Sequence, residues 1–345
     1  MVPASQRAAG VSALVCSIVI PTYNGRELLA TCLASLARHR PAHLAIEIIV
    51  ADDASIDDTS AWLAAHHPDV RHVRLARNQG FCAAANAGID AARGRFVQLL
   101  NNDAEVTAGW LEAGLGPFDD ARVGSVAPLV LMRRDPERVD SAGDVYAFFG
   151  RPTKRGHGQH ATKWLKQPAG KVLGASGSSA FYRADALRLV GGFDLSFGSY
   201  YEDVDLAFRL RWAGFDCVYE PKCRILHDVS ATYDHTNPEL QRRLSRNAEL
   251  LFWSNLPTPR LALAVAPHFA FLAAQLVYRT LRGRARPFLA GKLDAWRRGV
   301  EIPSRRRIRR ELAHQAVAPP RFPLRLAPWS EHPGPPEQRR ARDRA

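Results

Sequence analysis

A carboxylate that could bind a metal ion stands just after a short apolar run. Residues 96–100 read Phe-Val-Gln-Leu-Leu, and Asn102 and Asp103 follow almost at once. Such a run is typical of a buried strand that brings polar side chains to the edge of a sheet, where ligands of open α/β sheets bind. A carboxylate beside amides suits a hard divalent cation that also contacts phosphate oxygens. An ordinary Asx turn after the strand is the alternative.

Two earlier strands are expected to end in polar clusters of the same kind. Residues 15–20 and 46–51 are mostly apolar, and the clusters that follow them are Thr22-Tyr23-Asn24 and Asp52-Asp53. Such runs are expected for strands buried on both faces of a parallel sheet. The carboxyl ends of parallel strands share one edge, so the three clusters should converge on one crevice. One cluster would indicate a turn, whereas three indicate a binding site.

Another segment could hold an anion. Arg77 and Asn78 precede Gly80 and a run of alanines at helical spacing. A glycine followed by small residues lets a helix N-terminus approach an anion closely, and an arginine adds a bidentate phosphate partner. A tightly packed Ala-rich helix that binds no ligand is the alternative for these residues.

A group of acids opens a predicted helix further along the chain. Glu202, Asp203 and Asp205 stand in its first turn, and the apolar residues that follow have helical spacing. Acids in a first turn also favour the helix dipole, so capping is an alternative role for Glu202 and Asp205. His227 comes after the next strand and is either a surface histidine or a ligand.

Residues 133–171 lose periodicity and are rich in Gly, Pro, His and basic residues. We expect a long irregular segment that binds a ligand or orders on binding, because such loops are unusual inside a compact domain. A regular pattern resumes near Gly174 and Ser176, whose small size would let a substrate lie against the backbone.

The elements that must position these residues alternate in type. Helical spacing over 26–38 and 60–66 alternates with the apolar runs 15–20, 46–51 and 70–75. This is the spacing of βαβ units and predicts an α/β fold with a Rossmann-like, mostly parallel sheet flanked by helices. A chain of 345 residues can bury one large core of this kind and still carry an appendage.

Cysteines and the N-terminus bear on the cellular compartment. Five scattered cysteines without a C-x-x-C pair indicate neither a disulfide framework nor a zinc site, and a reducing cytoplasm fits best. Residues 13–20 could be mistaken for the apolar part of a signal peptide. Only Arg7 precedes them and Pro21 follows, so we expect a first strand instead.

Most of the net charge of +13 lies at the C-terminal end. After Tyr278 the chain has eighteen Lys and Arg against six Asp and Glu, so the preceding residues are nearly neutral. A neutral domain with a basic tail indicates an anchoring segment and speaks against nucleic acid as a partner.

Residues 261–278 are apolar nearly all round, although Pro267, His268 and Gln275 weaken the prediction of a membrane span. Residues 288–310 mix arginines with aromatic and apolar residues, which favours helices lying on an anionic membrane. The alternative is that they are solvated helices that pack on the preceding domain. From Pro319 the Pro and Arg content predicts disorder.

The chain resembles family 2 glycosyltransferases of the GT-A fold over roughly residues 15 to 260. Six short motifs occur in the family's order, at residues 17–25, 51–55, 77–81, 99–103, 191–194 and 202–206. We therefore expect an N-terminal extension at 1–14 and a GT-A domain at 15–255. The domain would have a nucleotide-sugar-binding half at about 15–125 and an acceptor-binding half at 126–255. Amphipathic or apolar basic helices would follow at 256–318 and a disordered tail at 319–345.

The resemblance implies a role for each matching residue. Asp103 would ligate a divalent metal, Mn²⁺ or Mg²⁺, with His227 as a further ligand, and Asp203 would be the catalytic base. Donor contacts would come from Thr22, Tyr23, Asn24, Asp52, Asp53, Arg77, Asn78 and Asn102. Glu202, Gly174 and Ser176 would lie on the acceptor side. Asn at the first two places of the family's acidic triplet would weaken metal binding.

The activity implied is inverting transfer from a nucleotide-sugar donor. Inversion requires a base on one face of the sugar and a cation near the leaving diphosphate on the other, which Asp203 and Asp103 would supply. Relatives with such tails often transfer rhamnose or another deoxysugar to a glycan or lipid-linked glycan in cell-wall or surface polysaccharide synthesis. We expect a cytoplasmic protein, peripheral on the inner face of the cell membrane; a non-catalytic nucleotide-sugar or glycan-binding protein is the alternative.

Overall fold

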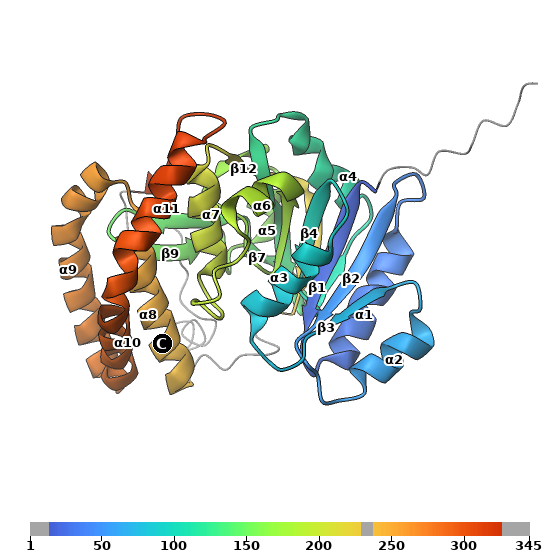
Figure 1. Cartoon of the computed structure of the whole chain (residues 1–345), viewed down its shortest axis with the longest axis horizontal. Helices are drawn as coiled ribbons and strands as arrows, with labels where there is room; N and C mark the ends of the chain where they lie inside the picture. Colours follow the sequence, from blue (N-terminus) through green and yellow to red (C-terminus); the bar gives the residue numbers. More distant parts are fainter. Residues whose placement is uncertain (1–13, 229–236, 326–345) are drawn as a thin grey trace, which may run out of the picture.

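The computed structural model describes residues 14–228 and 237–325 (Figure 1). Its strands are β1 (Cys16–Thr22), β2 (Ile46–Asp52), β3 (Arg71–Arg74), β4 (Phe96–Leu100), β5 (Ala104–Val106), β6 (Val123–Met132), β7 (Asp135–Ser141), β8 (Asp144–Ala147), β9 (Arg151–Lys154), β10 (Gly170–Val172), β11 (Ser179–Arg183), β12 (Asp216–His227) and β13 (Leu324–Arg325).

The α-helices and two 3-10 helices lie between and after these strands. They are α1 (Arg26–His39), α2 (Thr59–His66), α3 (Phe81–Ala91), α4 (Trp110–Leu115), η1 (Gly116–Asp119), α5 (Ala161–Leu165), α6 (Ala184–Val190), α7 (Glu202–Trp212), α8 (Pro238–Asn255), α9 (Thr258–Leu281), α10 (Ala285–Arg297), η2 (Arg298–Glu301) and α11 (Ile302–His314).

The main sheet is mixed, with the order β10-β12-β6-β11-β4-β1-β2-β3. β1, β2, β3 and β4 run parallel, as the βαβ spacing predicts. β11 runs antiparallel to both β4 and β6, and β12 runs parallel to β6, so β11 is an antiparallel strand within a sheet that is mostly parallel, as predicted. The carboxyl ends of β1, β2 and β4 therefore meet at one edge.

Side chains along each strand alternate between the two faces of the sheet, so its apolar strands present two apolar faces. Helices cover both of them. On β1, Ile18 and Ile20 pack in the core that contains α1 and α4, whereas Val19 packs in the core that contains α3. All five cysteines are buried and free, in agreement with the absence of a disulfide framework.

The prediction of a long irregular segment over 133–171 is wrong. β7 pairs antiparallel with β6, β8 and β9 form a hairpin, and α5 and β10 follow. These strands turn polar residues inward, since Asp140 and Asp144 are buried and Lys154 Nζ lies 2.9 Å from Asp140 Oδ2. Inward polar residues break the apolar alternation by which a strand is detected in a sequence.

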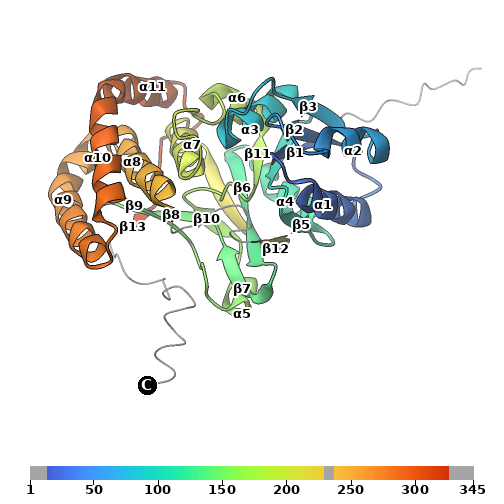
Figure 2. The same ribbon diagram turned by 90° about the horizontal axis from the view of Figure 1, so that it is seen from below.

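The helices α8 to α11 gather at the end of the molecule away from α1 and α2 (Figures 1 and 2). Arg305 Nη1 lies 2.6 Å from Asp194 Oδ2, and Arg309 Nη2 lies 2.6 Å from Asp205 Oδ1. The two arginines are buried, so this part of the Arg-rich segment packs on the α/β domain instead of facing a membrane. Their charges neutralise acids that would otherwise be buried alone.

Helix α9 is attached to the domain at its middle. His268 Nε2 lies 3.1 Å from Glu249 Oε2, and His268 Nδ1 lies 2.8 Å from the carbonyl oxygen of Phe149. The imidazole also stacks on Phe252 with ring centroids 3.7 Å apart. By length and composition, α9 is the one helix in the described ranges that could cross a membrane, and 11% of its most apolar window is buried.

The predicted disordered tail from residue 319 begins within the described residues. There β13 pairs with β8, which adds a strand to the β8–β9 hairpin. The prediction for residues 326–345, like that for 1–13, falls outside the described residues.

Candidate active site

Strand register brings Asp103 and His227 together. Asp103 lies between β4 and β5, and β12 pairs antiparallel with β5 so that His227 is opposite Ala104. The Asp228 backbone N–H donates to the carbonyl oxygen of Asp103 at 3.0 Å. His227 Nε2 then lies 3.2 Å from Asp103 Oδ1. Residues distant in the sequence thus place a carboxylate and an imidazole side by side, and their role as metal ligands stays a prediction.

His227 is oriented by a carboxylate that the sequence did not indicate. Its Nδ1 lies 3.0 Å from Asp140 Oδ2, and Asp140 also pairs with Lys154 and with His157, whose Nδ1 lies 3.2 Å from Asp140 Oδ1. Asp140 is fully buried, and Lys154 and the two histidines hold its pKa well below the usual value although burial acts to raise it. An ionised carboxylate behind a histidine fixes the ring orientation.

The pair fits a divalent cation. Asp103 Oδ1 is buried, and its contact with His227 Nε2 falls outside normal hydrogen-bond geometry, so this oxygen could turn to a cation. Burial acts to lower the pKa of His227, but the Asp103 and Asp140 carboxylates outweigh it and raise the pKa to about 9. A cation between Asp103 and His227 would replace that proton. No group of three or more His, Cys, Asp or Glu side chains in the described ranges is arranged to hold a metal ion, so diphosphate oxygens and water would complete the ligand set.

Replacing Asp140 with asparagine should weaken Mn²⁺ binding by about 10- to 100-fold, because the ligand histidine loses the carboxylate that orients it. Calorimetric titration of Mn²⁺ in the presence of a nucleoside diphosphate would measure this. Asp135→Asn is the matched control, since Asp135 lies on the same strand but is exposed. Equal Mn²⁺ affinities in the two variants would contradict an orienting role for Asp140.

Asp203 lies at the first turn of α7 and is held by backbone donors. The Gly177 N–H donates to Asp203 Oδ2 at 2.8 Å, and the Val204 N–H donates to Oδ1 at 2.8 Å. The carbonyl oxygen of Ser178 in turn accepts a hydrogen bond from the Asn101 N–H at 3.0 Å. The loop from Gly177 to Ser178 therefore links Asp203 to the end of β4, shortly before Asp103.

Asp203 shares its surroundings with two further carboxyls. Burial is the main cause that raises the pKa of Asp203, and it raises the pKa of Glu202 and Asp144 still more, with the Asp203 charge as the second cause. Glu202 Oε2 and Asp144 Oδ2 are buried without a hydrogen-bond partner. A carboxylate of raised pKa is suited to accept a proton near neutral pH.

The backbone that delivers Asp203 is strained. Tyr200 and Tyr201 both have φ of +69°, in the left-handed region that bulky residues rarely adopt. Asn247 on α8 holds this turn, since its Nδ2 donates to the carbonyl oxygens of Ser199 and Tyr200 at 3.1 and 2.8 Å. Strain of this kind persists only where the surroundings enforce it, and it is common at functional sites.

The predicted donor residues fall into an inner and an outer group. In the inner group, Asn102 Nδ2 donates to Thr22 Oγ1 at 2.9 Å, which joins the ends of β1 and β4. Asp53 accepts the Gln79 and Gly80 N–H groups at 2.7 Å each, so it holds the loop before α3.

Asp52 is buried as well. Its Oδ1 accepts the Ser55 N–H at 2.8 Å and its Oδ2 lies 3.3 Å from His72 Nε2. Burial acts to raise the pKa of Asp52, but hydrogen bonds with Ser55, His72 and Ser60 lower it below the usual value.

The outer group consists of exposed residues along the same edge. Tyr23, Asn24, Arg77 and Asn78 are exposed, and Asn24 Oδ1 accepts the Ile56 N–H at 2.8 Å. The structure thus gathers the predicted donor residues around the carboxyl ends of β1, β2, β3 and β4. Their contact with a nucleotide stays a prediction.

Gly174 and Ser176 are buried near α7. A Cβ at Gly174 would lie 2.3 Å from the Ala207 Cβ, so a glycine is needed there for helix packing. Ser176 Oγ lies 3.2 Å from Ser178 Oγ. The small size of Gly174 is explained without a substrate against its backbone.

Asp140, Asp144 and Lys154 are the site residues that the sequence did not reveal. They all lie in the segment without periodicity, on β7, β8 and β9. Lys154 interacts electrostatically with Asp140, Asp144 and Asp203, so β9 connects the surroundings of the Asp103 and His227 pair with those of Asp203. Acids inside a Gly-rich basic segment were the signal that could have found them.

The mixed sheet with these clusters at its edge is the GT-A fold. The mannosyltransferase PcManGT from Pyrobaculum calidifontis, solved in complex with GDP-Man and Mn²⁺, superimposes with a TM-score of 0.52 and 19% identity over 81% of this chain and 86% of that one. GalNAc-T7, solved with UDP, GalNAc and Mn²⁺, superimposes with a TM-score of 0.55 and 16% identity over 70% of this chain and 48% of that one. These similarities concern the fold alone.

The family model for glycosyl transferase family 2 matches residues 17–191, and the chain belongs to that family. Its sequence is 32% identical to the pre-mycofactocin glycosyltransferase of Mycobacterium tuberculosis over 61% of this chain and 42% of the relative, so it spans less than half of that protein. It is also 30% identical to the N-acetylglucosaminyl-diphospho-decaprenol L-rhamnosyltransferase of the same species, over 62% of this chain and 76% of the relative.

Proposed function

We propose that this protein is an inverting, metal-dependent glycosyltransferase that moves a sugar from a nucleotide-sugar donor to a glycan or lipid-linked glycan acceptor. The observation that carries the proposal is the division of the site into two ends. Asp103 and His227 form an oxygen and nitrogen pair, with a 3.2 Å separation, on one side. Asp203, on a different element, supplies a carboxylate of raised pKa on the other.

Each end has its own task in this mechanism. Asp203 takes the proton from the acceptor hydroxyl as that oxygen attacks the anomeric carbon, and the Gly177 N–H keeps the carboxylate aimed. Asp103 and His227 would hold a cation, which stabilises the charge on the leaving diphosphate when bound. Lys154 lies among the carboxyls of both ends and limits their mutual repulsion.

A deoxysugar such as rhamnose is the first donor sugar to test, because one relative bears the name of an L-rhamnosyltransferase acting on a decaprenol-linked sugar. The experiment is a thermal-shift screen of nucleotide sugars against the full chain, with and without Mn²⁺, followed by donor turnover. We expect stabilisation by a nucleotide sugar that is larger with Mn²⁺, together with turnover. Binding without any turnover would favour a non-catalytic binding protein, and no binding at all would refute the proposal.

We further propose that the enzyme is cytoplasmic and lies on the inner face of the cell membrane through α9 and α10. Their large apolar side chains that are exposed are Leu263, Phe269, Val277, Tyr278, Leu281, Leu289, Leu293 and Trp296. Basic residues stand beside them on the same helices and their connection, among them Arg282, Arg284 and Arg286. A helix that meets the domain along one side, through Ala264 and His268, suits a position on the membrane surface better than a span.

Replacing Leu281 and Trp296 together with serine should weaken binding to anionic vesicles by at least about tenfold, because two large side chains no longer enter the lipid. Sedimentation with phosphatidylglycerol vesicles at low salt would measure the loss. Ile56→Ser is the control, since Ile56 is as exposed, at 85%, but lies near the donor residues. Unchanged sedimentation of the double variant would place the anchor elsewhere.

A further inference from the structure

The turn before α7 determines where the candidate base Asp203 lies. Tyr200 and Tyr201 both have φ of +69° there, Tyr201 directly precedes the helix, and Asp203 is the second residue of α7. A left-handed conformation of two bulky residues persists only where neighbouring groups enforce it. The groups that enforce the turn therefore also set the direction in which the Asp203 side chain points.

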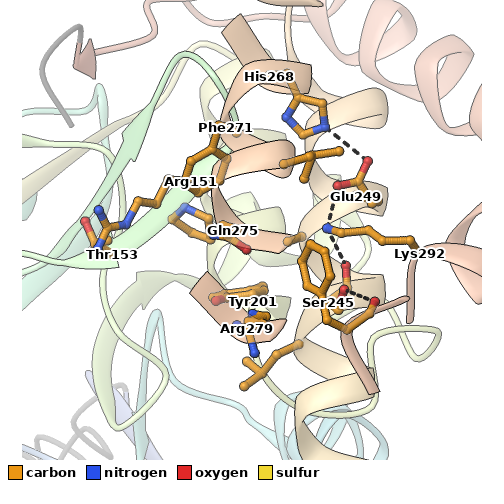
Figure 3. Close-up of a pocket in the computed structure, with 16 residues that line it drawn as sticks. Arg151, Thr153, Tyr201, Ser245, Glu249, His268, Phe271, Gln275, Arg279 and Lys292 are labelled. Carbon is orange, nitrogen blue, oxygen red and sulfur yellow. Dashed lines mark hydrogen bonds and ion pairs between the residues drawn. The ribbon is translucent and has the colours of Figure 1, made fainter. Parts of the chain in front are cut away.

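On one side the turn borders a pocket. The pocket has a volume of about 260 Å³ and is lined by Tyr201 together with Ser245 and Glu249 of α8 and His268 and Arg279 of α9, as Figure 3 shows. A side chain at the wall of a pocket has fewer packing neighbours than one enclosed in the core, so packing restrains it less. The main constraint on this backbone must therefore come from other contacts of the turn.

Asn247 on α8 supplies such a constraint through its side-chain amide. Its Nδ2 donates to the carbonyl oxygens of Phe197, Ser199 and Tyr200 at 3.0, 3.1 and 2.8 Å. Asn247 is fully buried, and an amide has two N–H groups, so the three carbonyls share all that it can donate. Three carbonyls that point at one nitrogen require the chain to curl tightly around it.

The orientation of this amide is fixed in turn by Arg246. Arg246 Nε donates to Asn247 Oδ1 at 2.9 Å, so the amino group of Asn247 faces the turn. Arg246 Nη2 also donates to the carbonyl oxygen of Phe197 at 3.1 Å. Arg243 Nη1 donates to Ser199 Oγ at 2.7 Å. Residues three and four apart on a helix are neighbours, so one face of α8 holds the whole turn.

α8 is positioned by the helices that follow it. Glu249 lies two residues after Asn247, and its carboxylate contacts His268 Nε2 on α9 at 3.1 Å and Lys292 Nζ on α10 at 2.7 Å (Figure 3). All three helices lie after residues 17–191, which the family model matches. The turn that carries the candidate base is therefore held by a part of the chain outside that match.

We propose that Asn247 is a positioning residue for sugar transfer: its amide holds Tyr200 and Tyr201 in the left-handed conformation, and this turn directs Asp203 toward the acceptor hydroxyl. The inference rests on the proposed function, because it takes Asp203 as the base. Asn247 acts through the backbone and touches no substrate. Its contribution should therefore appear in turnover and not in donor binding.

The first test replaces Asn247 in the full chain. Asn247→Ala should lower kcat by about ten- to a hundredfold, because a displacement of about 1 Å at a reacting group can cost about a hundredfold. The KM for the donor and the Mn²⁺ affinity should change by less than about twofold, since the proposed donor residues and metal ligands lie on other elements. Asn247→Asp keeps the shape of the side chain but cannot donate to carbonyl oxygens, so its kcat should fall as far.

A rescue variant separates positioning from stability. Glycine adopts a positive φ about as readily as a negative one, so a turn with glycine at position 201 needs less enforcement. Tyr201→Gly added to Asn247→Ala should therefore raise kcat by at least about threefold above that of Asn247→Ala alone. The glycine restores no packing and no hydrogen bond, so a residue that only stabilised the fold would not be rescued.

Asn237→Ala is the matched control on the same helix. Asn237 caps the start of α8, where its Oδ1 accepts the Glu239 N–H at 2.8 Å. Loss of an N-cap destabilises a helix, so this variant should lower the melting temperature. Its kcat should stay within about twofold of the wild-type value, because the cap lies about three helical turns before Asn247.

Hydrogen exchange without substrate measures the position of Asp203 independently of turnover. The Gly177 N–H donates to Asp203 Oδ2 at 2.8 Å from a separate loop, so its exchange reports whether that carboxylate is in place. Exchange at Gly177 should be at least about tenfold faster in Asn247→Ala than in wild type or in Asn237→Ala. Absence of turnover in the wild type would refute the proposed function, whereas the exchange result would still decide whether Asn247 positions Asp203.

Three outcomes would overturn the inference. The first is unchanged exchange at Gly177, or unchanged kcat in an active enzyme, in Asn247→Ala. The second is an equal loss of kcat in Asn237→Ala, which would attribute the effect to the stability of α8. The third is a double variant with no more turnover than Asn247→Ala, which would mean that Asn247 does not act through the strained turn.

Discussion

Replacing Asp203 with asparagine should leave the protein folded and able to bind donor while turnover falls by at least about a hundredfold. Asparagine has nearly the same shape, and its carbonyl oxygen can still accept the Gly177 N–H that Asp203 accepts at 2.8 Å. What it cannot do is take a proton from the acceptor hydroxyl. Turnover with donor and acceptor, together with donor binding by thermal shift, would measure the two effects separately.

The neighbouring acids provide matched controls. Asp205 is fully buried and pairs with Arg209 at 2.8 Å and Arg309 at 2.6 Å, so Asp205→Asn should lose stability by about 3–5 kcal/mol, the range for breaking a buried ion pair. Glu202→Gln tests the other acid of the first turn. Full turnover in Asp203→Asn with collapse in Glu202→Gln would move the base to Glu202.

The pH dependence gives a second test of the same assignment. A base must be ionised to act, so activity should fall as the pH drops through the pKa of the base. Burial raises the pKa of Asp203 above the usual value of an aspartate, and this acid limb should therefore lie at a higher pH than for an exposed carboxyl. An acid limb at the ordinary aspartate pKa would contradict the desolvated environment.

Replacing Asp103 with alanine should remove the Mn²⁺-dependent part of donor binding and lower turnover by about a thousandfold or more, since a cation at a leaving diphosphate supplies several kcal/mol. Asp103 Oδ1 is the buried oxygen without a normal hydrogen bond, 3.2 Å from His227 Nε2. Donor titrations with and without Mn²⁺ would measure the effect.

His227→Ala is the companion variant, because it removes the other member of the pair from a different strand. Both variants should lose Mn²⁺ dependence while keeping metal-independent nucleotide binding. If Asp103→Ala lowers only the melting temperature and its donor binding still responds to Mn²⁺, Asp103 is a residue of the turn after β4 and the metal is bound elsewhere.

Predictability from the sequence differed between the two halves of the site. β1, β2 and β4 are apolar runs with abrupt polar ends, and parallel pairing places such ends at one edge, so the region of Asp52 and Asp103 could be predicted. The proximity of Asp103 and His227 depends on the register between β5 and β12, which no local pattern determines. The prediction that Asp103 and His227 act together came from the family resemblance.

The contacts of Asp140 and His268 could not be predicted, because a buried acid on a strand and a histidine in an apolar helix are both unusual. Asp140 and Asp144 are buried acids on β7 and β8, and the burial of an ionised Asp140 depends on its contacts with Lys154, His157 and His227. His268 in an apolar helix weakened the prediction of a membrane span, whereas its actual role is a contact with Glu249. Long-range pairing of polar groups is not encoded in hydrophobic periodicity.

The contact between Arg309 and Asp205 limits how far the chain can be shortened from its C-terminal end. It joins α11 to the helix that carries Asp203, and Arg309 Nε also lies 3.0 Å from Asn255 Oδ1 at the end of α8. A chain shortened after residue 255 would leave the Asp205 carboxylate in the interior with one of its two arginines gone. We therefore expect that the smallest active unit extends through α11. Exchange of C-terminal segments between relatives should succeed only when the matching acid is exchanged with them.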